Sequence, residues 1–143
     1  MPFLVVKPEP SGHPGTGTIV EADGDAPVVR DLHYVFDWWV GDDLVGSYPF
    51  FLVTERLRAS LAAIGDASGF AFAGVQVTSS EFFRRTSPEK SLPGFCWLQV
   101  HGSPGIDDMG LSRDHALVVS GRVLAVLLDH ALEQADISQF RTR

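Results

Sequence analysis

Two pairs of neighbouring aspartates, each next to a glycine and large apolar residues, could carry chemistry in this sequence. One pair ends the segment Asp37-Trp38-Trp39-Val40-Gly41-Asp42-Asp43, and the other lies within Gly105-Ile106-Asp107-Asp108-Met109-Gly110. Aromatic anchors within a charged rim are typical of protein-binding surfaces. We therefore predict that the partner-binding residues are Trp38, Trp39, Asp42, Asp43, Asp107 and Asp108.

Paired carboxylates have two other roles that residue type leaves open. They perform general acid–base catalysis when one carboxylate raises the pKa of its neighbour. They also cap turns and helices without any functional role, and one of the two tryptophans would then pack in the core. The sequence does not separate these interpretations, and it identifies no catalytic residue.

Other chemistries have weaker signals. The five histidines show none of the close spacings, such as HxH or HExxH, that place metal ligands on one element. A metal would need ligands from distant positions, namely His101, His115, Asp107 and Asp108, and we expect neither a metal nor a cofactor. The single cysteine, Cys96, lies in an apolar run, which favours a buried and unreactive thiol. The sequence also lacks the GxSxG, GxGxxG and Walker patterns.

Length, charge and composition exclude several classes of protein. The 143 residues make one domain, and a formal net charge of -7 argues against binding to nucleic acid. No apolar run approaches the roughly 20 residues of a membrane span. A single cysteine and a first segment without the features of a signal peptide predict a cytoplasmic protein.

The elements that must position these residues differ along the chain. Residues 1–31 are predicted to form an acidic, loop-rich region, packed on or preceding the domain, with a short strand at 18–20; the first 50 residues hold eight acidic residues but only Lys7 and Arg30. Residues 32–143 are predicted to form a single α+β domain. Its expected strands are 32–39, 50–53, 70–77 with a bulge at Gly74, 95–101 and 116–119.

Helices are indicated by caps and apolar spacing. Thr54 and Ser120 are the expected N-caps of two main helices, over 55–64 and from 121 to about 132. Thr78 and Glu81 form a capping-box pattern that predicts a third, short helix around 82–83. The predicted fold is α+β, with a mixed, largely antiparallel sheet of about five or six strands and two main helices packed on it.

Two segments match at an offset of 66 residues. Leu52-Val53-Thr54-Glu55-Arg56-Leu57 aligns with Val118-Val119-Ser120-Gly121-Arg122-Val123. Each reads as a strand, a hydroxyl cap, an arginine and an amphipathic helix. Either a shared origin or convergence on a small set of cap and core residues would produce this match.

These short motifs resemble a set of small uncharacterised bacterial proteins, over about residues 32–138. Those proteins are similar in turn to immunity proteins of polymorphic toxin systems, which reuse a strand followed by Ser/Thr-Glu-Arg and a helix. Thr54-Glu55-Arg56 fits this pattern, whereas Ser120-Gly121-Arg122 has a glycine in place of the glutamate. The paired-cysteine motifs of one such group are absent. The motifs that carry the resemblance are Asp37-Trp38, Gly41-Asp42-Asp43, Pro49 to Leu57, Leu92-Pro93, Trp97-Leu98, Asp107 to Ser112 and Leu117 to Ser120.

The leading functional hypothesis is a cytoplasmic protein-binding module, an immunity-type inhibitor whose acidic surface covers the basic site of a cognate toxin. The alternative is a small enzyme or ligand-binding protein of biosynthetic type. Its pocket would be lined by Trp38, Trp39 and Trp97, with the paired aspartates as acid–base groups. A subunit that works only as an oligomer is a third interpretation.

Overall fold

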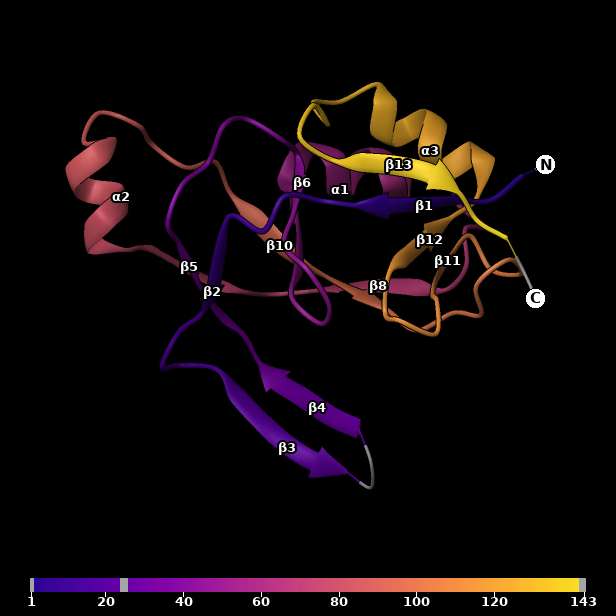
Figure 1. Cartoon of the computed structure of the whole chain (residues 1–143), viewed down its shortest axis with the longest axis horizontal. Coiled ribbons are helices and arrows are strands. Elements are labelled where there is room, and N and C mark those ends of the chain that lie inside the picture. The colour runs from indigo at the N-terminus through magenta and orange to yellow at the C-terminus, as the bar shows by residue number, and fades with distance from the viewer. Residues whose placement is uncertain (1, 24–25, 142–143) are drawn as a thin grey trace.

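The computed structural model of the chain describes residues 2–23 and 26–141, and its elements form an α+β fold (Figure 1). The elements, in chain order, are β1 (Leu4–Lys7), β2 (Gly12–Pro14), β3 (Ile19–Asp23), β4 (Ala26–Asp31), β5 (His33–Phe36), β6 (Leu44–Val45), β7 (Phe51–Thr54), α1 (Glu55–Ala62), β8 (Phe70–Ala73), β9 (Gln76–Ser79), α2 (Glu81–Thr86), β10 (Phe95–Val100), β11 (Met109–Leu111), β12 (Leu117–Val119), α3 (Gly121–Leu128) and β13 (Asp136–Gln139).

The strands form four small sheets, so the prediction of one sheet with five or six strands is wrong. The strand orders are β11-β12-β1-β13, β6-β7-β10-β8, β2-β5-β9 and the hairpin β3-β4. Within the described residues these pairings are antiparallel except for β5 with β9. The segment expected as one strand over 70–77 is divided at Gly74, because β8 pairs with β10 while β9 pairs with β5. A chain that changes sheets in this way cannot build one continuous layer.

The N-terminal region contributes an inner strand. β1 lies between β12 and β13, with Val5 opposite both Val118 and Ser138. Prolines and glycines between Lys7 and Pro27 predict loop, yet β2, β3 and β4 also lie within residues 1–31. Short strands tolerate such residues at their ends, where a missing donor or side chain disrupts few ladder contacts.

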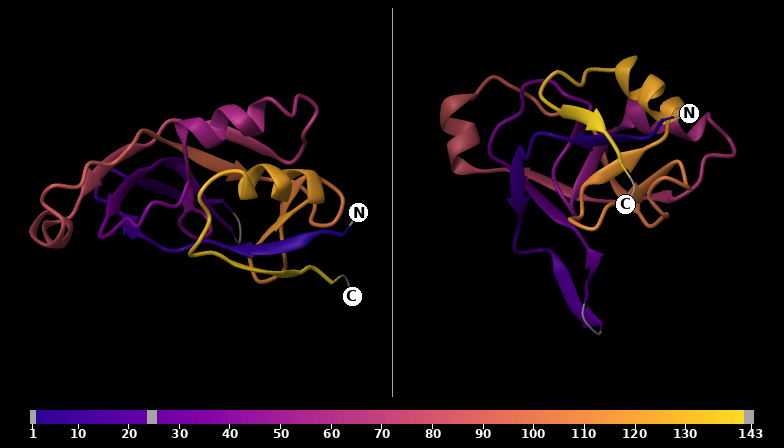
Figure 2. Two further views of the ribbon diagram at one scale, coloured as in Figure 1. Left: turned by 90° about the horizontal axis from the view of Figure 1, so that it is seen from above. Right: turned by 45° about the vertical axis from the view of Figure 1, so that its right-hand side comes forward.

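The two main helices are present and pack side by side (Figure 2). Leu57 and Leu61 of α1 and Val123 and Leu127 of α3 enter one apolar core together with residues of the first two sheets. Both predicted caps are confirmed. The backbone N–H of Leu57 donates to Thr54 Oγ1, and that of Val123 donates to Ser120 Oγ, each at 3.3 Å.

The short helix α2 begins two residues later than the capping-box pattern predicts. Its N-cap is Ser80, whose Oγ accepts from the N–H of Phe83 at 3.1 Å. Thr78 is part of β9, opposite Val35, and so cannot cap the helix. Phe83 anchors α2 to a second apolar core that also contains Tyr34, Phe36 and Trp97.

The β3–β4 hairpin projects from the rest of the molecule (Figures 1 and 2). Its side chains Ile19, Val20 and Val28 are 48%, 52% and 42% exposed. Within the described residues, no helix is long and apolar enough to span a bilayer.

Candidate functional site

Asp43 is the buried centre of a polar cluster, which we call the Asp43 clasp (Asp43, Thr54, Arg56 and Ala131). The Thr54 hydroxyl and Arg56 Nε both donate to Asp43 Oδ1 at 2.7 Å, and the N–H of Ala131 donates to Oδ2 at 2.9 Å. The carboxylate is 1% exposed. Burial raises the pKa of Asp43, but the hydrogen bonds from Arg56, Thr54 and Ala131 outweigh it, so the pKa is lowered overall.

Asp108 is the centre of an equivalent cluster, the Asp108 clasp (Asp108, Ser120, Arg122 and Ser68). Ser120 Oγ and Arg122 Nε donate to Asp108 Oδ1 at 2.7 and 2.9 Å. Arg122 Nη2 and the N–H of Ser68 donate to Oδ2 at 2.8 and 3.0 Å. The hydrogen bonds from Arg122, chiefly, hold the pKa of Asp108 well below its usual range.

The two clasps have the same construction and are linked crosswise. Each aspartate precedes a short strand, and the next strand leads through the hydroxyl cap into a helix whose second residue is the arginine. Ala131, which completes the Asp43 clasp, follows α3, whereas Ser68, which completes the Asp108 clasp, follows α1. The 66-residue match therefore marks two segments with the same local structure. The aspartate of each segment accepts a hydrogen bond from the chain that follows the helix of the other segment.

The other member of each aspartate pair also binds backbone donors. Asp42 is 1% exposed and accepts from the N–H groups of Glu133 and Gln134 at 2.9 and 2.8 Å. Asp107 accepts from the N–H of Ser103 at 2.7 Å, and this hydrogen bond lowers the pKa of Asp107. The four aspartates thus have the geometry of caps, one of the roles that the sequence leaves open.

The three tryptophans lie in different environments. Trp38 is 40% exposed, and its Nε1 donates to Glu9 Oε1 at 2.8 Å. Trp39 donates to the carbonyl oxygen of Asp42 and packs edge-on against Phe95, while Trp97 is buried. A cavity of about 140 Å³ lies beside Trp97, but neither Trp38 nor Trp39 lines it.

The six predicted partner-binding residues therefore do not meet on one open surface. Trp38 is the only one of them that is exposed; Asp42, Asp43 and Asp108 are buried, and Trp39 and Asp107 are half-buried. The structure brings Trp39 onto the Asp42 backbone but places Asp107 and Asp108 at the start of a different sheet.

The structure also shows the surroundings of the candidate nucleophile, Cys96, and of the candidate metal ligands. Cys96 is half-buried rather than buried, and its thiol donates to Glu55 Oε2 at 2.8 Å. Burial, together with Glu55, raises the pKa of Cys96 to about 11, which disfavours the reactive thiolate. His115 stacks on Tyr48. In the part of the chain that the structure describes, no three His, Cys, Asp or Glu side chains form a metal-binding group.

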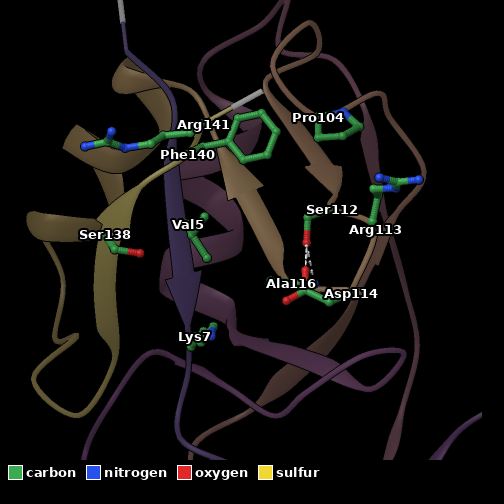
Figure 3. Close-up of a pocket in the computed structure, with 10 residues that line it drawn as sticks. All are labelled: Val5, Lys7, Pro104, Ser112, Arg113, Asp114, Ala116, Ser138, Phe140 and Arg141. Atoms are coloured by element: carbon green, nitrogen blue, oxygen red, sulfur yellow. Dashed lines mark hydrogen bonds between the residues drawn. The ribbon is translucent and has the colours of Figure 1, made fainter. Parts of the chain in front are cut away.

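A larger cavity, of about 500 Å³, was not foreseen from the sequence (Figure 3). It lies against β1 and β13 and the segment 112–116, and its lining includes Lys7, Arg113, Arg141, Ser112 and Phe140. Its residues come from both ends of the chain and follow no motif. One sequence signal could have indicated it. Val5 and Lys7 flank the buried Val6 in β1, so their side chains point to the opposite face of the sheet, away from the core.

A scan against protein-family models, a search of curated proteins and a search of solved structures each found no match. The resemblance to immunity proteins accordingly depends on the short sequence motifs alone.

Proposed function

We propose that this protein is a protein-binding module and that a partner docks on the projecting β3–β4 hairpin. The observation that carries the proposal is the exposure of Ile19, Val20 and Val28 on a two-stranded element that projects from the rest of the molecule. Val29 of the same hairpin packs against the second apolar core and attaches the element to the body. Exposed apolar side chains grouped on one element are typical of interaction surfaces.

The hairpin exposes apolar side chains on both of its faces. Val20 lies opposite Val29, and Val28 lies opposite Glu21, so Val20 and Val28 point to opposite sides of the two-stranded ribbon. A hairpin of two strands is marginally stable by itself in water. A partner that covers either face would remove apolar surface from water and so stabilise the hairpin.

Charge supports a basic partner. Residues 19–31 contain four acidic residues and one arginine, and Asp31 is exposed. Arg30 is already paired with Glu21 at 2.7 Å, which leaves the segment with an excess of negative charge. An acidic projection of this kind would accelerate association with a basic surface at low salt. This is the behaviour of an immunity-type inhibitor of a basic toxin, the partner that the sequence motifs suggest.

In this proposal the four paired aspartates hold the body rigid and do not touch the partner. Trp38 remains a candidate contact, since it is exposed and fixed by Glu9. The alternative of a small enzyme has no specific observation in its favour, because the three tryptophans do not line one pocket and the aspartates bind internal donors.

The test combines partner capture with kinetics. The tagged protein would be used to isolate a partner from the native cell, and the association and dissociation rates of the purified pair would be measured over a salt series. The double variant Val20→Asp with Val28→Asp should raise the dissociation constant at least about tenfold, since it introduces charge on both hairpin faces. Asp31→Asn should chiefly slow association at low salt.

The matched control is Ile106→Asp with Leu128→Asp, which places the same two charges on side chains that are 80% and 57% exposed and lie outside the hairpin. This variant should bind as the wild type does. If the hairpin variant, with an unchanged circular dichroism spectrum, binds as tightly as the wild type, the hairpin is not the docking surface. If association is independent of salt, the partner is not recognised through charge.

A further inference from the structure

The 500 Å³ cavity lies on a face of the β11-β12-β1-β13 sheet that none of the described helices covers. Val5 is opposite Val118 on one side and Ser138 on the other, so these side chains share one face of the β11-β12-β1-β13 sheet. Val6, Leu117 and Val119 occupy the other face and belong to the main core. The loop at Pro104 covers Gly110 and bounds the cavity on the outer face.

Three cationic side chains surround this cavity: Lys7, Arg113 and Arg141. In Figure 3, Arg113 and Arg141 lie on opposite sides of the cavity with their guanidinium groups directed outward at its rim, and the ring of Phe140 extends toward Pro104. Asp114 is the one carboxylate in the lining, and its carboxylate accepts from Ser112 Oγ. The lining therefore has a positive excess in a protein whose net charge is -7.

These cations differ from the other lysines and arginines that the structure describes. The other seven each donate to a carboxylate or a carbonyl oxygen of the protein: Arg30, Arg56, Arg58, Arg84, Arg85, Lys90 and Arg122. Among the described residues, Lys7, Arg113 and Arg141 make no such hydrogen bond, although Lys7 lies opposite Asp136 in the β1–β13 register and close enough to Asp114 to lower the pKa of that carboxyl. Their donors are thus available to a ligand.

We infer that this cavity binds a small organic polyanion, a molecule with two or more phosphate or carboxylate groups and a flat apolar part. Cations on different sides of the cavity match separated or multiple anionic groups, and guanidinium groups bind phosphate and carboxylate in two-point contacts. The Phe140 ring, with Val5, Pro104 and Ala116, offers apolar surface to the rest of the ligand. The volume is within the range of small-molecule sites.

The inference is independent of the proposed protein partner, because it involves none of the hairpin residues. It is tested with adenosine diphosphate as a probe that has both a polyanionic and a flat part, with adenosine and inorganic pyrophosphate as its separate halves. Each is titrated into the ¹⁵N-labelled protein, and amide shifts are followed by NMR. Adenosine diphosphate should give saturable shifts at Ser112, Ala116 and Ser138, and bind more tightly than either half.

The double variant Lys7→Ala with Arg113→Ala should weaken this binding about tenfold or more, the loss expected when charged contacts worth about 1.4 kcal/mol disappear. Arg84→Ala with Arg85→Ala changes the net charge equally on the exposed helix α2 and should bind the probe as the wild type does. Absence of saturable shifts at the cavity would overturn the inference. An equal loss in the two double variants would also overturn it, because the binding would then reflect overall charge.

Discussion

At the scale of single residues, the hydroxyl groups of Thr54 and Ser120 each have two structural partners. Each accepts the N–H of a residue in the first helical turn and donates its own proton to a buried aspartate. The hydroxyl thus satisfies an otherwise unpaired helix N–H and supplies a donor to a buried carboxylate, which would be costly to leave without partners. The cap could be predicted from sequence, but the second contact could not.

Thr54→Ala and Ser120→Ala should each lower the free energy of unfolding by about 1 to 2 kcal/mol, the range for loss of a capping hydroxyl. The measurement is urea unfolding followed by circular dichroism. The swaps Thr54→Ser and Ser120→Thr retain the oxygen and should cost less than the alanine variants. An alanine variant as stable as the wild type would show that the cap and the aspartate contact contribute nothing to stability.

At the scale of elements, the helices and several strands could be predicted, because their signals lie within a few residues. Thr54 and Ser120 stand directly before apolar residues at helical spacing, and the strand at Phe95 has β-branched and aromatic neighbours. The sheets could not be predicted, because pairing depends on partners distant in sequence. The division at Gly74 looks locally like a bulge, and only the separate partners of β8 and β9 make it a change of sheet.

The predicted site residues show the same division. Their positions in turns were evident from the glycines beside them, but the donors that bind them were not. The N–H that completes the Asp43 clasp belongs to Ala131, 88 residues away, and Ser68 is 40 residues from Asp108. The spacing of nearby residues does not indicate such distant contacts, so a buried aspartate cannot be distinguished from an exposed one in the sequence.

Gly69 tests how closely the start of β8 approaches β11. Its φ is +94°, and a Cβ there would lie 2.1 Å from the Met109 carbonyl oxygen. Gly69→Ala should therefore lower the free energy of unfolding by about 2 kcal/mol or more, through backbone strain and overlap. Gly74→Ala is the matched control, because no atom lies within 4 Å of its added Cβ. Equal stability of the two variants in a urea titration would contradict the close approach.

At the scale of the whole molecule, the clasps and the strand order interleave the two halves of the chain. β1 lies between β12 and β13, and β10 lies between β7 and β8. The Asp43 clasp includes a backbone N–H from the chain after α3, and the Asp108 clasp includes one from the chain after α1. Neither half can form its sheets and satisfy its buried aspartate alone. The protein should consequently unfold in a single cooperative transition.

Acid should destabilise this whole unit. The pKa values of Asp43 and Asp108 are lowered in the folded state, so their contribution to stability is complete above the unfolded value of about 3.9 and is lost as pH falls below it. Melting temperatures should be steady from about pH 7 to pH 5 and fall steeply below pH 4. Asp108→Asn should be less stable at pH 7 and lose less on acidification.

The matched control is Asp31→Asn, which removes an exposed carboxylate outside both clasps. It should reproduce the wild-type pH dependence. Two separate transitions in acid would show that the clasps do not join the halves, and an unchanged pH dependence of Asp108→Asn would show that another group causes the acid sensitivity.

The place of β1 also affects how the protein is made. Val6 pairs with Leu117, 111 residues later in the chain, so β1 leaves the ribosome long before β12 is available to pair with it. At bacterial or eukaryotic elongation rates of 5–20 residues per second, this wait is on the order of ten seconds. During that time Val5 and Val6 have no sheet partner. Chaperones that hold nascent chains should therefore affect the yield of this protein more than its final stability.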